Sequence, residues 1–289
     1  AGRRRGDLDA RLDGVARPFT IDIRFLNSPP ADLRDAYVAG AMRWMEVITG
    51  DLPDIVINQP DQWSCRGIAL PQMTETIDDM VIFARIGPDD GPGGVLARAG
   101  PCTTVERAGT RLTSIGYMQF DVADADLLNN TNRFTAVVAH EMGHVLGLLN
   151  DRWRFHGLIT GEGSTDPFFT GSQAVAAWPL LGISYSGTPV PIENDGGVGT
   201  ADSHWRESIL VEELMTGWIE ATGVPMPLSA VTVGAIADIG YVVNPAAADP
   251  YTPGLRGLAA PMGAKIRLNE VLHDAQYTIG TGGRLTPID

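Results

Sequence analysis

One segment constrains this chain more than any other: His140-Glu-Met-Gly-His-Val-Leu-Gly147, which matches the pattern H-E-x-x-H. Apolar residues recur around it at three- and four-residue steps, which predicts an amphipathic helix over residues 131–147. Four helical residues advance by about 400°, so His140 and His144 leave one face of that helix one turn apart. Two imidazoles in this arrangement can bind the same tetrahedral zinc ion.

The residue after the first histidine predicts chemistry as well as binding. Glu141 lies beside the metal without binding it. It can take a proton from a zinc-bound water, whose pKa zinc lowers to about 7, and return that proton to a leaving amine. These roles predict a hydrolase of peptide bonds with Glu141 as the general base.

Two glycines belong to the same segment. Gly147 stands where the chain must turn after the helix. Gly143 is costly in a helix interior, by about 1 kcal/mol relative to Ala, so we expect a substrate or a strand to lie close to the helix there. The competing interpretation, two exposed histidines on a surface helix with an incidental glutamate, leaves Gly143 unexplained.

A catalytic zinc needs a third protein ligand and one open position. The remaining histidines are His156, His204 and His273. The compact metzincin spacing would place a histidine at position 150, which is Asn150. We predict His204 as the third ligand, and interpret His156 as a loop histidine and His273 as part of a weakly patterned tail.

A second motif, shortly after His204, is the basis of this prediction. Glu213-Leu-Met-Thr-Gly217 resembles a methionine turn, in which Met215 would be a packing floor beneath the metal histidines and not a ligand. A rival class of zinc site takes a glutamate from a later helix as its third ligand. The candidates for that role are Glu207, Glu212 and Glu213.

Length and charge bound the remaining possibilities. A chain of 289 residues suffices for one large domain or two lobes around a cleft. Its net charge of −14 argues against a nucleic-acid partner. The surplus of carboxylates leaves room for Ca²⁺, but no aspartate-rich loop of the EF-hand kind supports a calcium site. No run of about 18 apolar residues predicts a membrane span.

Cys65 and Cys102 are the two cysteines, too far apart for a C-x-x-C motif. They form either one disulfide or two buried thiols. We expect the disulfide, because the other features favour a secreted or extracellular protein.

Hydrophobic periodicity gives a coarse map of the chain. It predicts strands at 19–25, 54–57, 79–86 and 115–122, and helices at 31–49, 131–147, 172–181, 208–216 and 229–239. We divide the chain into a flexible leader or propeptide remnant (1–18), an N-terminal catalytic lobe (19–147), a C-terminal catalytic lobe with a long insertion (148–245) and an extension that packs on the catalytic domain (246–289).

Taken together, the motifs resemble those of the leishmanolysin family of metzincin peptidases, particularly its bacterial members. The matching parts are the segment 140–147, a long insertion over 148–203, His204-Trp-Arg-Glu-Ser208 and the methionine turn. The resemblance covers roughly 19–245. It implies an α+β fold with an N-terminal lobe, made of a twisted mixed sheet, a backing helix and the zinc helix, above an irregular C-terminal lobe and a substrate cleft.

The resemblance also implies a zinc endopeptidase that acts on proteins at or outside the cell surface. One zinc ion would be held by His140, His144 and His204. Substrates would bind in extended form by adding to an edge strand, for which we take residues 115–120. The known parasite members are rich in disulfides and membrane-anchored, whereas this chain has two cysteines and no visible anchor. A monomer is expected.

Two alternatives stay open at this point. One is a non-catalytic binding or adhesion protein that keeps zinc for its structure, against which Glu141 argues, since a structural site needs no general base. The other is a zinc peptidase with a glutamate as third ligand.

Overall fold

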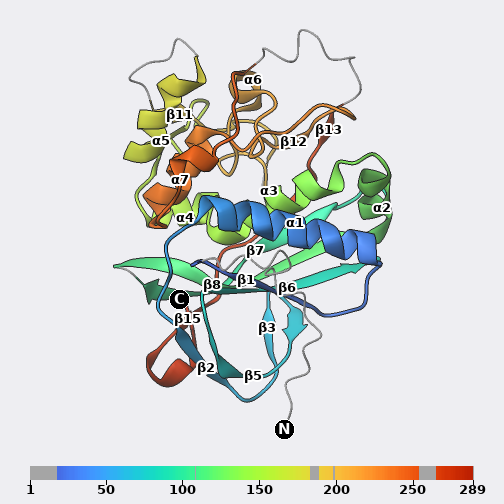
Figure 1. The fold of residues 1–289 in the computed structure, drawn as a ribbon, viewed down its shortest axis with the longest axis vertical. Helices are drawn as coiled ribbons and strands as arrows, with labels where there is room; N and C mark the ends of the chain where they lie inside the picture. The colour runs from blue at the N-terminus through green and yellow to red at the C-terminus, as the bar shows by residue number, and fades with distance from the viewer. Residues whose placement is uncertain (1–17, 108, 183–188, 198, 254–264, 289) are drawn as a thin grey trace.

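The computed structural model describes residues 18–107, 109–182, 189–197, 199–253 and 265–288, so nearly all of the expected leader lies outside the described residues. Its centre is a mixed sheet in which four long strands lie in the order β1-β6-β8-β7 (Figure 1). Their bounds are Ile21–Phe25 (β1), Met80–Gly87 (β6), Thr110–Asp121 (β8) and Ala97–Arg107 (β7). The first three run parallel, and β7 runs antiparallel to β8.

Both faces of this sheet are covered, which explains the unbroken apolar run in β6. Met80 and Ile82 point to a core shared with the helices, whereas Val81 and Phe83 belong to a second core on the opposite face. A strand buried on both faces has no polar side, so its sequence does not alternate.

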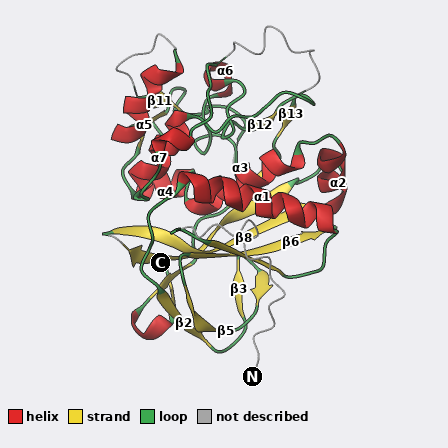
Figure 2. Ribbon diagram, viewed as in Figure 1, coloured by secondary structure: helices red, strands yellow, loops and turns green. Residues whose placement is uncertain are grey.

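Helices cover one face of the sheet (Figure 2). They are Ala31–Val47 (α1), Val122–Asn130 (α2) and Phe134–Leu146 (α3). The indole Nε1 of Trp44 on α1 donates a hydrogen bond of 2.8 Å to the carbonyl of Ala139 on α3. The predicted helices at 31–49 and 131–147 are therefore confirmed, as the backing helix and the motif helix. In the part of the chain that the structure describes, none of the helices is long and apolar enough to cross a membrane.

Two small antiparallel pairs of strands cover the other face. One is a hairpin of Trp63–Cys65 (β3) and Ile68–Leu70 (β4), and it is inserted between the strands of the other antiparallel pair, Ile55–Gln59 (β2) and Met73–Ile77 (β5). The expected disulfide is present: Cys65 on β3 is bonded to Cys102 on β7, with a Cα–Cα distance of 5.4 Å. It ties this layer to the central sheet.

Beyond α3 the chain forms short elements joined by loops. They are Asn150–Phe155 (α4), Ile159–Thr160 (β9), Phe168–Phe169 (β10), Ser172–Ala177 (α5), Trp178–Leu181 (η1), Val190–Pro191 (β11), Glu207–Leu210 (α6), Trp218–Ile219 (β12), Ala230–Ile239 (α7) and Pro245–Ala247 (η2). The predicted helices at 172–181 and 229–239 are confirmed. Together with the mixed sheet, these elements give the expected α+β fold.

The prediction of a helix at 208–216 was wrong. Helix α6 ends at Leu210, and Val211 comes next with a φ of 41°, which a right-handed helix does not accept. The Glu213 carboxylate then accepts a hydrogen bond from the backbone N–H of Met215. Such local bonds between a side chain and the backbone compete with helix formation.

The last described residues add strands to the sheet. They form Ile266–Arg267 (β13), Glu270–Leu272 (β14), Tyr277–Ile279 (β15), Thr281–Gly283 (η3) and Leu285–Pro287 (β16). Strand β13 pairs with β12, whereas β14 and β15 both pair with β7. In Figure 1, β13 lies among the upper elements and β15 lies at the level of the sheet.

The expectation that residues 115–120 form an edge strand was also wrong. They lie within β8, which pairs with β6 on one side and β7 on the other. Strand β7 follows β8 in the sheet, and its other edge pairs with segments from the end of the chain. The sequence map missed β7 because Gly100 and Pro101 interrupt its pattern and its ladder with β8 is irregular there.

Candidate metal centre

Helix α3 presents its two histidines to one point. Both side chains are fully buried, and their Nε2 atoms lie 2.9 Å apart. Each ring is fixed from behind: His140 Nδ1 lies 2.7 Å from the carbonyl oxygen of Leu214, and His144 Nδ1 lies 2.5 Å from that of Leu148. The one-turn spacing of the motif therefore produces two rings whose Nε2 atoms converge.

Gly147 makes the second of these contacts possible. It caps α3 in a left-handed conformation with a φ of 118°, which favours glycine. The chain then turns back, and the N–H of Leu148 donates to the carbonyl of Gly143 at 2.9 Å. The same turn places the Leu148 carbonyl against His144.

His204 comes from a loop and completes the group. Its Nε2 lies 3.2 Å from that of His140 and 3.1 Å from that of His144, and its ring stacks on His140 with centroids 5.1 Å apart. Its Nδ1 lies 3.0 Å from the carbonyl oxygen of Thr200. The structure thus brings together the three histidines that the sequence pattern selects.

These contacts fix the chemistry of the three rings. A backbone carbonyl can only accept a hydrogen bond, so each Nδ1 carries a hydrogen, and in the neutral form that binds a metal each ring turns the lone pair of Nε2 inward. Three lone pairs within about 3 Å repel one another unless a cation lies between them. A tetrahedral zinc with bonds of about 2.0–2.1 Å would separate its nitrogen ligands by about 3.3–3.4 Å, close to the observed distances. The donor set therefore fits zinc.

Glu270 on β14 is a fourth member that sequence reasoning missed. Its Oε1 lies 2.8 Å from Nε2 of His204, and its Oε2 lies 3.5 Å from that of His140 and 3.7 Å from that of His144. The side chain is fully buried, and the histidine rings are the groups that offset the cost of burying its charge. Its ligand atom and those of the three histidines lie within 4.8 Å of one another, so the four residues form a possible metal site.

Charge and burial act on this group in opposite directions. Burial alone would raise the pKa of Glu270, but the three histidines outweigh it and lower that pKa well below its ordinary value. Burial alone would lower the pKa of His204, but the facing carboxylate outweighs it and raises that pKa. A divalent cation would supply the positive charge that this carboxylate favours.

One sequence signal could have found Glu270. Ile266, Leu268 and Leu272 alternate along the tail, and Glu270 takes the remaining position in that series. A carboxylate in the series of apolar, inward-facing positions indicates either an outward turn of the strand or a buried partner.

Glu141 lies at the same centre. It is fully buried, and no N–H group of a described residue donates to its carboxylate oxygens, whereas the Glu270 carboxyl group lies within hydrogen-bonding reach. Burial and then the neighbouring Glu270 carboxylate raise the pKa of Glu141 well above its ordinary value. Burying a carboxylate to which no N–H group donates costs stability. Groups kept at such a cost are typical of functional sites.

Met215 lies directly beneath α3. A Cβ placed on Gly143 would come within 2.7 Å of the Met215 sulfur and 3.1 Å of the Trp44 ring. Gly143 therefore makes room for the methionine and the tryptophan, and the expectation of a substrate or strand at that point was wrong. The loop around Met215 is anchored by Glu213, whose carboxylate accepts hydrogen bonds from Met215, Ser229 and Thr232.

The other candidates lie elsewhere. The Nε2 of His156 is 3.3 Å from the Arg152 guanidinium, and His273 packs against Gly100. Among the rival glutamates, Glu207 forms an ion pair of 2.5 Å with Lys265, and Glu213 is committed to the methionine turn. Among the described residues, the group at the centre contains none of these four and no Glu212.

A comparison with known protein families gives an independent finding about this chain. Residues 49–252 match the family model of leishmanolysin. The match includes α3, His204 and Met215, and it ends before Glu270. No curated protein matches the chain. Because the family model covers more than two thirds of the chain and the donor set fits the metal on which the family depends, this protein belongs to the leishmanolysin family of zinc metallopeptidases.

Proposed function

We propose that this protein is a zinc-dependent endopeptidase in which His140, His144 and His204 bind one zinc ion and Glu141 is the general base. The observation that carries the proposal is the convergence of three buried Nε2 atoms at the centre that also holds the buried Glu141 carboxylate, to which no N–H group of a described residue donates. When bound in such a site, zinc polarises a carbonyl group and makes a water molecule more acidic.

Glu141 supplies the proton transfers. A carboxylate next to the attacking water accepts its proton, and the same group then donates that proton to the nitrogen of the leaving amine. Burial suits both steps, because it raises the pKa of the carboxyl group toward neutral pH. A group whose pKa lies near the working pH is effective both as a base and as an acid.

The outer strand β7 is the element that we assign to substrate binding. It is the last of the four long strands, and the edge that faces away from β8, which β14 and β15 occupy, is the one along which an extended peptide would pair. We also propose action outside the cell, which the disulfide between Cys65 and Cys102 supports, since such bonds persist in oxidising compartments.

The proposal is tested with the full zinc-loaded chain and a mixed library of quenched peptides. The Glu270→Ala variant is assayed alongside, because Glu270 fills the fourth position at the centre. We expect cleavage that a chelator abolishes in the wild type or in Glu270→Ala. In whichever of the two is active, Glu141→Gln should lower cleavage by about 10²–10⁴-fold with the zinc content unchanged. The exposed Glu106→Gln serves as the control. The assignment would be refuted if neither the wild type nor Glu270→Ala cleaved any peptide, although both were folded and loaded with zinc.

A second function is favoured by one observation, the carboxylate of Glu270. Four protein ligands and no open position are typical of a structural zinc site, which would suit a binding or adhesion protein. The carboxylate of Glu141 speaks against it, because a structural site gains nothing from a second buried acid that no N–H group stabilises. The same assay separates the two, since a structural site stays inactive when Glu270 is removed.

A further inference from the structure

The C-terminal segment 265–279 runs along the edge of β7. Leu96 donates a hydrogen bond of 2.7 Å to the carbonyl of Asn269, and β14 then pairs in parallel with residues 97–99. Further on, His273 donates to Ala99 and Gln276 to Cys102, before β15 pairs with residues 103–104. Over this length, the backbone edge that an extended peptide would need is already occupied.

The same segment enters the metal centre. Glu270 lies within β14 and turns its carboxylate toward the three histidines. Its backbone carbonyl points elsewhere: a Cβ placed on Gly199 would lie 2.7 Å from the Glu270 oxygen. The segment therefore offers the centre a carboxylate and keeps the adjacent peptide carbonyl packed against Gly199, so that bond is not presented for hydrolysis.

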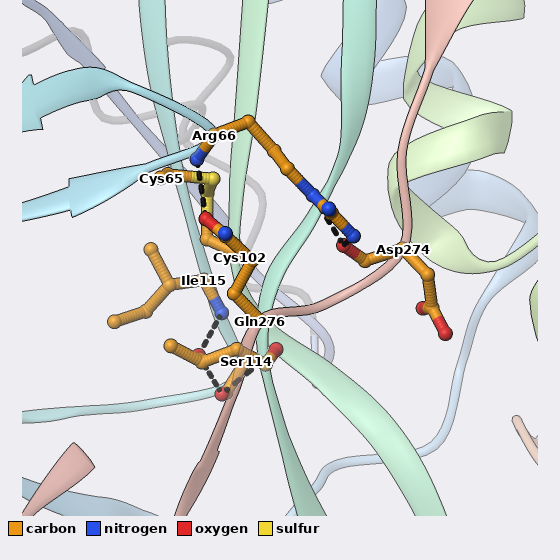
Figure 3. The surroundings of a disulfide bond; sticks show 8 residues. Cys65, Arg66, Cys102, Ser114, Ile115, Asp274 and Gln276 are labelled. Carbon is orange, nitrogen blue, oxygen red and sulfur yellow. Dashed lines mark hydrogen bonds between the residues drawn. A yellow bond between two sulfur atoms is a disulfide. The ribbon is translucent and has the colours of Figure 1, made fainter. Parts of the chain in front are cut away.

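Side chains hold both ends of the segment. At its start, Lys265 Nζ lies 2.5 Å from a Glu207 oxygen and 2.7 Å from a Glu220 oxygen. Further along, the backbone N–H of Arg66 donates to the side chain of Gln276 at 2.5 Å, and its guanidinium donates to the Asp274 carbonyl at 2.9 Å (Figure 3). Arg66 is the neighbour of Cys65, so the disulfide fixes the position of this anchor relative to β7.

We propose that residues 265–279 are an inhibitory segment that occupies the substrate position, with Glu270 as the fourth ligand of the metal. This inference rests on the proposed function, because a catalytic zinc needs one open position. Strand pairing along β7 blocks the extended substrate, and the Glu270 carboxylate blocks the attacking water. Activity then requires displacement of this segment.

The test uses the cobalt-substituted full chain and acetohydroxamate, a small metal-binding anion, with the visible absorption of cobalt as readout. We expect the wild type to bind acetohydroxamate weakly and the Glu270→Ala variant to bind it at least about tenfold more tightly. The apparent affinity falls with the fraction of protein in which Glu270 occupies the fourth position. Glu106→Ala, at the far end of β7, is the matched control and is expected to behave as wild type. Equal affinities of the wild type and Glu270→Ala would overturn the proposal.

A second variant leaves every residue of the centre in place. Lys265→Met removes the ion pairs to Glu207 and Glu220, and is expected to tighten acetohydroxamate binding and to speed amide hydrogen exchange in residues 97–104. Unchanged affinity and exchange would count against the inhibitory segment. Tighter acetohydroxamate binding by Glu270→Ala without chelator-sensitive peptide cleavage would support the blocking role of Glu270 and refute the peptidase function instead.

Discussion

The sulfur of Met215 occupies the space that any side chain at position 143 would need. Gly143→Ala should therefore destabilise the protein although Ala favours the helix by about 1 kcal/mol. We expect a net loss of about 1–3 kcal/mol in the free energy of unfolding, as for an overpacked core, measured by urea titration with chelator present.

The companion variant Met215→Ala shows whether the two residues act on each other. If they do, the double variant loses less stability than the sum of the two single variants. Strict additivity would mean that the Gly143→Ala effect arises elsewhere.

His204→Ala tests the third ligand. We expect zinc affinity to fall by more than the about 10- to 100-fold that accompanies loss of an outer hydrogen-bond partner, because a direct ligand is removed. Glu207→Gln is the comparison for the rival glutamate ligand, and because Lys265 keeps its second ion pair, with Glu220, zinc affinity should stay within a small factor. Zinc content by mass spectrometry of the native protein measures both, and the reverse pattern would favour a glutamate ligand.

Glu213→Gln tests the anchor of the methionine turn. Its carboxylate accepts four hydrogen bonds, from the N–H of Met215, the N–H and hydroxyl of Ser229 and the hydroxyl of Thr232. The amide of Gln would place its NH₂ group, a hydrogen-bond donor, against these N–H and hydroxyl donors. We therefore expect a loss of about 2–3 kcal/mol in the free energy of unfolding. Because Leu214 also orients His140, zinc affinity should fall as well. A stable variant with normal zinc affinity would show that the turn does not depend on Glu213.

Asp79 should make stability depend on pH. Burial raises its pKa from 3.8 to about 6, against hydrogen bonds from Leu52 and Thr20 and in concert with the neighbouring Asp78. The folded state therefore binds a proton more tightly than the unfolded state does. This contribution to stability is full below about pH 4 and is lost as the pH rises through about 6.

The measurement compares wild type with Asp79→Asn in urea titrations from about pH 3 to about pH 7, a range that brackets both pKa values. We expect the stability of the wild type relative to the variant to fall across this range. The exposed Asp54→Asn corrects for the loss of one charge. A difference that stays constant with pH would mean that Asp79 keeps its ordinary pKa.

Features encoded within one continuous segment were predictable from the sequence. The helix around His140 and His144 was predicted because its ligands, its apolar face and its capping Gly147 all lie within a short stretch of chain. Strand β6 was predicted for the same reason, as an unbroken apolar run.

The features that the sequence did not reveal depend on pairing between distant segments. Strand β7 contains Gly100 and Pro101, which spoil the alternation, and it exists because β8 and the tail pair with it. Glu270 lies in a strand of only three residues, where the alternation of Ile266, Leu268 and Leu272 is a weak signal, and only its partners far back in the chain give it a role. Residues 211–216 are not helical, because the buried hydrogen bonds of Glu213 outweigh the helix propensity of this segment.

The three imidazoles of the metal centre are all oriented by main-chain carbonyls, those of Leu214, Leu148 and Thr200. Every amino acid carries such a carbonyl, so exchanging a side chain at these three positions does not delete the acceptor itself. A substitution can disturb the orientation of these rings only if it moves a loop or replaces a ligand itself. The chain can therefore alter the surroundings of its metal, and with them its preference for substrates, while the affinity for the ion itself is kept.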